Sequence, residues 1–345
     1  MSRVLADRRA ATGGGPVRQG LSRALNYLLP FICLLSSAAF AAKGLYPGQS
    51  SALEVSVDRS VALRAADERP VPLKIFYPES GGPYPLIVLS HGTFSSIDRY
   101  GRIAGYWAGQ GYVVILPQHK DADYGVRPTG YEAMQAVTMS RVADLSLVLD
   151  ELDSIEQQVP ALEGRIDREH FVAAGHSIGT QVAMLVTGMQ FRTGFDDTLI
   201  KSDETRYSAL VLISDPGKMR LMPGDVWLAS SVPTFMATGT EDYGLMGGRG
   251  PATEPQSEVL TNTASIARYR LLLEGGDHYF GGLVQKDTDA TPDHEGLAIF
   301  NAVSTVFLDA ETKASIEARA YLEQVDLPAL TDGRAHLARH TAERN

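Results

Sequence analysis

Residues 171–186 read FVAAGHSIGTQVAMLV, and this stretch decides the fold. It opens with an apolar run of strand type, and it closes with the apolar helical run Val182–Val186. Between them, Gly175 and Gly179 flank Ser177 at two residues on either side, and glycines there let the backbone bend tightly from strand to helix. Such a turn projects a serine hydroxyl above the sheet. The setting predicts that Ser177 is a nucleophile; the alternative is a plain tight turn.

The rest of the chain repeats this rhythm, because short apolar runs alternate with longer amphipathic stretches from residue 53 onward. The rhythm predicts an α/β fold with a mostly parallel sheet of eight strands and helices on both faces. The expected strands are Glu54–Val57, Pro72–Tyr77, Leu86–Ser90, Tyr112–Leu116, Phe171–Ala174, Ala209–Ile213, Thr234–Ala237 and Tyr269–Leu273.

Other segments are predicted by their spacing and their polarity. Apolar residues at steps of three and four predict a helix from about Tyr131 to Gln158, which Pro160 ends. Two polar, glycine-containing segments, 191–207 and 243–264, are expected to be long loops; the alternatives are that they serve as lids or substrate-binding segments, or that they are surface loops with no such role. The region around His336 and His340 is expected to be polar or helical.

The N-terminal region has the layout of a secretory signal. Arginines precede the apolar run Leu28–Leu35, and small residues follow as far as Ala41. This layout predicts a cleavable signal peptide over residues 1–41, a single domain over residues 42–345, and a periplasmic or secreted protein. The apolar run is too short to span a bilayer, and cleavage would remove it, so no stable membrane span is expected in the mature protein. The alternative is an uncleaved anchor.

Composition excludes several classes of function. The chain of 345 residues has a net charge of −10, and without residues 1–41 it keeps 26 basic against 40 acidic residues, a net charge of −14. Such a surface argues against nucleic acid or an anionic membrane as a partner. The one cysteine, Cys33, lies in the predicted signal, so the mature domain has no thiol for a disulfide, a nucleophile or a metal. The sequence leaves the oligomeric state open.

A serine nucleophile needs a base, because its hydroxyl keeps its proton near neutral pH. His278 is the histidine expected to serve. It follows the last predicted strand in the run Gly275-Gly276-Asp277-His278, a glycine-rich loop at the sheet edge where the turn at Ser177 also emerges.

The imidazole in turn needs a carboxylate to fix its tautomer and to stabilise its charged form. Two aspartates lie between Ser177 and His278 at the ends of predicted strands, Asp242 and Asp215. Asp242 is favoured, because it ends a glycine-containing turn after the penultimate strand. Asp215 stays the alternative, although it precedes Pro216 and could instead cap a turn.

The oxyanion of a tetrahedral intermediate requires hydrogen-bond donors. One expected donor is the backbone N–H of Ile178, directly after the nucleophile. The other is expected in the loop after the third strand, where Gly92 allows the N–H of Thr93 to turn inward. A further cluster, His119, Asp121 and Asp123, has side chains that ligate metals, but Lys120 stands among them and no second histidine is spaced nearby. We interpret it as a solvated loop, and we expect no metal and no cofactor.

With these residues assembled, the chain resembles the α/β-hydrolase superfamily. The similar stretch runs from about Pro72 to Leu308, and within the superfamily the chain is similar to dienelactone-hydrolase-like, platelet-activating-factor-acetylhydrolase-like and bacterial polyester-hydrolase-like serine esterases. The most specific pieces read PLIVLSHG over residues 85–92, GYVVILP over 111–117, GHSIG over 175–179 and GDH over 276–278. Thr180 departs from the pattern, since such proteins usually carry glycine or alanine there.

The resemblance implies an α/β-hydrolase fold and a serine carboxylic-ester hydrolase that works through an acyl-enzyme. It implies that Ser177 is the nucleophile, His278 the base and Asp242 the acid, while acetylhydrolase-like members, whose acid lies on the earlier strand, keep Asp215 open. The expected substrate is a small-molecule, lipid or polymer ester. The alternatives are a lipase, acetylhydrolase or polyester hydrolase acting on a larger substrate, and a non-catalytic binding protein with the same fold.

Overall fold

The structure is a computed structural model that describes residues 45–46, 52–122, 125–192, 198–214, 232–243 and 267–340. All of them belong to one compact unit, residues 40–345. The predicted signal peptide lies outside the described residues, as do Asp123, Asp215 and nearly all of the segment 243–264.

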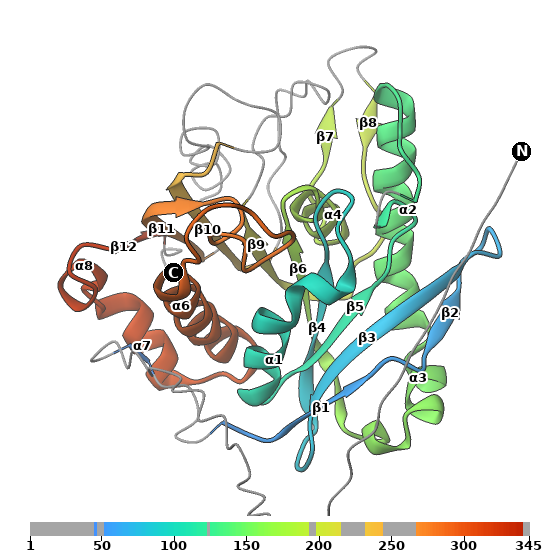
Figure 1. The fold of residues 1–345 in the computed structure, drawn as a ribbon. Coiled ribbons are helices and arrows are strands. Elements are labelled where there is room, and N and C mark those ends of the chain that lie inside the picture. The colour runs from blue at the N-terminus through green and yellow to red at the C-terminus, as the bar shows by residue number, and fades with distance from the viewer. Residues whose placement is uncertain are drawn as a thin grey trace, which may run out of the picture. The chain divides into compact units, whose positions relative to one another are not determined.

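Four strands, β1 to β4, open the described chain, and helices and further strands follow them (Figure 1). The strands are β1 (Val55–Asp58), β2 (Ala62–Arg64), β3 (Pro70–Pro78), β4 (Tyr84–Ser90), β5 (Val113–Pro117), β6 (Ile166–His176), β7 (Phe191–Arg192), β8 (Leu199–Ile200), β9 (Tyr207–Ile213), β10 (Thr234–Glu241), β11 (Arg268–Asp277) and β12 (Ala335–His340). The helices are α1 (Gly101–Gly109), α2 (Tyr131–Asp150), α3 (Leu152–Gln158), α4 (Ile178–Val186), α6 (His294–Thr312), α7 (Ile316–Gln324) and α8 (Leu327–Leu330), and short 3₁₀ turns are η1 (Ile97–Tyr100) and η3 (Pro160–Leu162).

One large sheet forms the centre of this unit. Its strand order is β1-β3-β5-β4-β6-β9-β10-β11-β12, with β2 paired to β3, and the strands from β5 to β11 run parallel. The α/β fold is therefore confirmed, and all eight predicted strands are present. The described sheet has ten strands rather than eight, because β2 and β12 pair antiparallel at the two sides. The segment around His336, expected to be polar or helical, is polar but forms the strand β12 and not a helix.

Helices cover both faces of the sheet (Figure 1). Alternate residues of each central strand enter two separate apolar clusters, since successive side chains of a strand point to opposite faces. On β4, for example, Ile87 and Leu89 pack in the cluster that contains residues of α1, α6 and α7, whereas Leu86 and Val88 pack in the cluster of α2, α3 and α4. Burial on both faces explains why the central strands read as continuous apolar runs.

The predicted helix over residues 131–158 is present but divided. Helix α2 ends at Asp150, and α3 begins at Leu152 and ends at Gln158. Pro160 opens the 3₁₀ turn that follows, as its lack of a backbone N–H predicts.

The parallel arrangement determines where a site can form. The carboxyl ends of β4, β6, β10 and β11 fall at the same edge of the sheet, at Ser90, His176, Glu241 and Asp277. Loops at this edge of an α/β sheet are where ligands bind. The edge therefore gathers the loops that hold the predicted site residues.

Candidate active site

Ser177 lies at a sharp turn between β6 and α4. Its backbone is in an unusual conformation, with φ 56° and ψ −124°, and the helix begins at the next residue, Ile178. A Cβ on Gly175 would lie 2.1 Å from the carbonyl oxygen of Gly179, and a Cβ on Gly179 would lie 2.2 Å from that of Ser90. Both glycines are therefore required for the close approach of backbone segments. The turn is further fixed by the Ser177 N–H, which donates to the Ile213 carbonyl at 2.9 Å.

Asp242 and His278 form a buried pair. The His278 Nδ1–H donates to Asp242 Oδ1 at 2.7 Å. His278 is 4% exposed and Asp242 is 0% exposed. The second carboxylate oxygen, Oδ2, accepts from the Thr238 hydroxyl at 3.2 Å. These contacts orient the carboxylate toward the imidazole. The structure thus brings together two residues that are 36 positions apart in the chain.

The pair depends on the close approach of the ends of β10 and β11. The register shifts between Gly239 and Glu241, so that Glu241 lies opposite Asp277. A Cβ on Gly239 would lie 2.0 Å from the Gly276 carbonyl oxygen, so only glycine fits there. The irregular register places Asp242 next to the first residue after β11, which is His278.

The hydrogen bonds leave two reactive atoms unused. With Nδ1–H donating to Asp242, the neutral imidazole has its lone pair on Nε2. His278 Nε2 and Ser177 Oγ are both buried and have no hydrogen-bond partner among the described residues. A proton acceptor and a hydroxyl donor, both without a partner, thus lie at the same edge of the sheet.

The two expected oxyanion donors lie at the same edge. Ile178 is the first residue of α4, where helix N–H groups have no partner within the helix. Thr93 lies in the loop after β4, and its carbonyl accepts from Gln285 Nε2 at 3.3 Å. Phe94, with φ 54°, turns the chain directly after Thr93. Because Ser90 pairs with Gly175 in adjacent strands, this loop and the turn at Ser177 are neighbours.

A buried chain of hydrogen bonds, not predicted from the sequence, joins the loop after β4 to the His278 loop. The Gly92 N–H donates to the Tyr100 oxygen at 2.8 Å, and the Tyr100 hydroxyl donates to His176 Nδ1 at 3.0 Å. The His176 Nε2–H then donates to the His278 carbonyl at 2.9 Å. Burial, followed by the neighbouring His278, lowers the pKa of His176 to about 3, so the ring stays neutral. The sequence signal for His176 was only its place inside the pentapeptide.

The interpretation of His119 and Asp121 as a solvated loop was wrong, since both residues are only 2% exposed. The Ser90 hydroxyl donates to His119 Nε2 at 2.9 Å, and the His119 Nδ1–H donates to Asp144 at 2.8 Å. Asp121 pairs with Arg141 at 2.6 Å. Ser90, His119 and Asp144 thus form a second hydrogen-bonded set of a serine, a histidine and an aspartate. All three residues are buried, and both ring nitrogens of His119 are used in hydrogen bonds within the set. We therefore interpret them as supports of the loop after β4.

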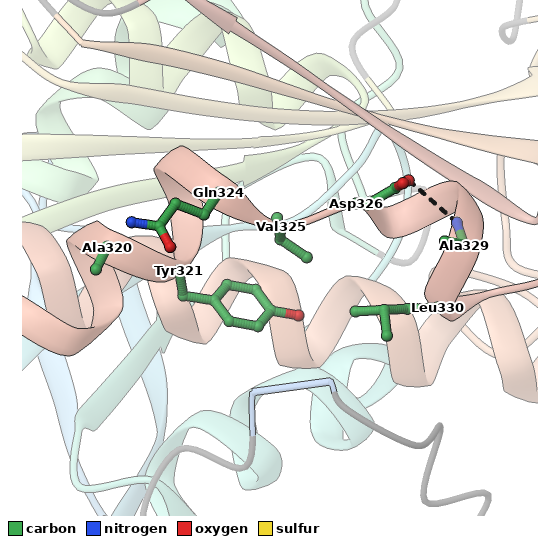
Figure 2. A pocket seen from close by; sticks show the side chains of 7 residues that line it. All are labelled: Ala320, Tyr321, Gln324, Val325, Asp326, Ala329 and Leu330. Carbon is green, nitrogen blue, oxygen red and sulfur yellow. Dashed lines mark hydrogen bonds between the residues drawn. The ribbon is translucent and has the colours of Figure 1, made fainter.

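Other candidate sites do not gather comparable chemistry. A pocket of about 340 Å³ lies between α7 and α8, and Figure 2 shows Tyr321, Val325 and Leu330 around it. Its one carboxylate, Asp326, accepts from the Ala329 N–H at 3.2 Å and so caps α8. Within the described ranges, no group of three or more His, Cys, Asp or Glu side chains is placed to hold a metal ion. In those ranges, too, no helix has the length and apolar character needed to cross a membrane.

The sheet, its helical layers and the strand-to-helix turn define a fold of the α/β-hydrolase type. The model of the chlorophyllase family matches residues 41–216, about half of the chain, and the chain belongs to this family. The matched region contains the loop after β4 and the turn at Ser177, whereas Asp242 and His278 lie beyond it. No curated protein matches the chain. Family membership implies an ester or another small molecule as the substrate.

Proposed function

We propose that the protein is a serine carboxylic-ester hydrolase that works through an acyl-enzyme. The observation that carries the proposal is the buried Asp242–His278 hydrogen bond of 2.7 Å, together with the partnerless Nε2 of His278 and Oγ of Ser177. Membership in a hydrolase family supports the same conclusion. Asp215, the alternative acid, lies outside the described residues, so the choice of Asp242 rests on its contact with His278.

The proposed reaction has two halves that share one proton carrier. Ser177 Oγ forms a bond to the ester carbonyl carbon while its proton passes to His278 Nε2, and Asp242 stabilises the resulting imidazolium. The N–H groups of Thr93 and Ile178 donate to the oxyanion. The intermediate then expels the alcohol, which takes the proton from His278. Water repeats the sequence on the acyl-enzyme, releases the acid and restores Ser177.

The substrate is proposed as an ester, and the family name makes chlorophyll one ester to test. A lipase, acetylhydrolase or polyester hydrolase would act on larger esters through the same atoms. The segments 191–207 and 243–264, predicted to be long loops, are described only in part, at β7, β8 and neighbouring residues. The substrate class therefore has to come from measured rates.

The test compares the wild type with Ser177→Ala on p-nitrophenyl acetate, octanoate and palmitate and on chlorophyll. We expect the variant to lose at least about a thousandfold in kcat, because the covalent step is removed. Ser208→Ala is the matched control, since its hydroxyl donates to the Phe171 carbonyl at the opposite end of the sheet, and it should keep the wild-type rate. A fluorophosphonate probe should label Ser177.

Equal rates for the wild type and Ser177→Ala would refute the proposal. A folded wild-type protein that neither hydrolyses the esters nor takes up the probe would instead favour a binding protein with this fold. The dependence of rate on acyl length then separates a short-chain esterase from a lipase or polyester hydrolase.

A further inference from the structure

Arg141 of α2 is a fully buried cation whose side chain reaches the loop after β4. It is 0% exposed. Its guanidinium donates to the carbonyl of His91 and, at 3.2 Å, to the carbonyl of Gly92. On its other side, Nε and Nη2 donate to Asp121 at 2.9 and 2.6 Å. The planar donor fork of arginine thus joins a buried carboxylate to two consecutive backbone carbonyls.

A buried ion pair of this kind does not by itself stabilise a fold, because desolvation of the two charges offsets much of their attraction. Burial alone would raise the pKa of Asp121, yet the charge and hydrogen bonds of Arg141 hold it at about 2. The carboxylate therefore stays ionised and fixes the guanidinium. What the pair determines is the position of the carbonyls that it holds.

One of these carbonyls belongs to the peptide unit that carries a predicted oxyanion donor. The Gly92 carbonyl and the Thr93 N–H lie in one planar trans peptide and point in opposite directions. The Gly92 oxygen also accepts from His91 Nδ1–H at 2.8 Å and from the Ser95 N–H at 3.3 Å. Donors that hold the carbonyl in place therefore fix the direction of the Thr93 N–H.

We propose that Arg141, held by Asp121, is a positioning residue that orients the Gly92–Thr93 peptide so that the Thr93 N–H donates to the ester oxyanion. The inference rests on the proposed serine-hydrolase function. A cation on the carbonyl side also polarises the peptide, which makes its N–H a stronger donor. Arg141 itself does not touch the substrate.

The test measures kcat and KM for Arg141→Lys and Arg141→Gln. Removal of an oxyanion donor costs about 10²–10³ in kcat, and a misdirected donor should cost less. We therefore expect kcat to fall about 10–100-fold, with KM within about twofold. Asp121→Asn should cause a smaller fall. Arg268→Lys is the matched control, because Arg268 is also 0% exposed but lies at the start of β11, at the opposite edge of the sheet from His278, and it should keep kcat.

A second readout separates positioning from a structural role. A thionoester replaces the carbonyl oxygen with sulfur, which accepts hydrogen bonds poorly, so an intact oxyanion hole favours the oxygen ester strongly. The ester-to-thionoester ratio of kcat/KM should fall in the Arg141 variants by about the factor lost in kcat for the ester. General loosening of the fold would lower both rates equally.

Three outcomes would overturn the inference. The first is an Arg141 variant that keeps kcat within twofold of the wild type, and the second is an Arg141 variant whose ester-to-thionoester ratio equals that of the wild type. The third is a folded wild type without Ser177-dependent hydrolysis, which overturns the proposed function as well. If Arg141→Gln does not fold, the ratio in Arg141→Lys and in Asp121→Asn decides.

Discussion

At the residue scale, the carboxylate of Asp242 has a separate task for each oxygen: Oδ1 accepts from His278 at 2.7 Å, and Oδ2 accepts from Thr238 at 3.2 Å. We expect Asp242→Asn to lower kcat by about 10²–10⁴-fold, because the amide cannot support the reactive tautomer and the imidazolium. Thr238→Val should lower kcat only about 2–10-fold, since one neutral hydrogen bond contributes about 1 kcal/mol. The measurement is kcat on p-nitrophenyl acetate.

The matched comparison is Asp215→Asn, because Asp215 was the alternative acid in the sequence. It should keep kcat within about threefold if Asp242 serves His278. A full rate in Asp242→Asn together with a collapse in Asp215→Asn would show that the Asp242–His278 hydrogen bond does not serve catalysis.

The sequence predicted three residues of the candidate site, because each of them has a local setting or a place in the chain order that marks it. Ser177 was marked by its flanking glycines, and His278 and Asp242 by their places after predicted strands. Thr238, Tyr100 and Arg141 carried no such signal. Their roles come from contacts across the fold, as in the bond of Arg141 to a carbonyl 50 positions away, and a linear pattern does not encode those contacts.

At the element scale, the turn between β6 and α4 depends on backbone packing. We expect Gly179→Ala to destabilise the protein by about 1–3 kcal/mol and to lower ester hydrolysis at least about tenfold, because its Cβ would lie 2.2 Å from the Ser90 carbonyl oxygen. A backbone atom cannot swing aside as a side chain can. The turn and the loop after β4 would therefore move together. Urea unfolding and the rate on p-nitrophenyl acetate measure the two effects.

The control for this prediction is Gly105→Ala in α1. The nearest atom that its Cβ would meet is 3.8 Å away, in Phe76, so ordinary contact results. Alanine there should stabilise the protein by about 0.5–1 kcal/mol, because glycine in a helix interior carries an entropic cost. If both alanine variants behave alike, close packing at the turn is not what requires Gly179.

Elements were predictable where both faces of a strand are buried. Strands β4, β5 and β9 read as apolar runs, because helices pack on both sides of them. Strand β12 escaped prediction because its sequence, AHLARH, lacks such a run. Its pairing with β11 comes from backbone hydrogen bonds at the edge of the sheet.

At the scale of the whole molecule, three buried histidines are held neutral within the described residues. Burial is the largest cause of the lowered pKa of His91, His119 and His176. Arg141 beside His91 and His278 beside His176 lower the pKa further, whereas Asp144 opposes the shift at His119. The His176 ring joins the loop after β4 to the His278 loop, whereas the rings of His91 and His119 hydrogen-bond around the loop after β4 itself.

Because the pKa values of these three histidines are lowered in the folded protein, we expect the free energy of unfolding to fall as the pH drops. In the unfolded chain a histidine binds its proton near pH 6.5, whereas the folded rings do so at lower pH, near 3 for His176. Below about pH 6.5 the unfolded state therefore binds more protons, and the free energy of unfolding decreases by up to about 1.4 kcal/mol per pH unit for each histidine. Protonation of Asp121, whose pKa in the folded protein is about 2, lowers the free energy of unfolding further only below about pH 4.

Urea unfolding between pH 7.5 and 4.5 measures how steeply the free energy of unfolding depends on pH, and His176→Gln should reduce this slope by about one proton. A free energy of unfolding that stays constant over this range would show that the buried rings accept protons without unfolding.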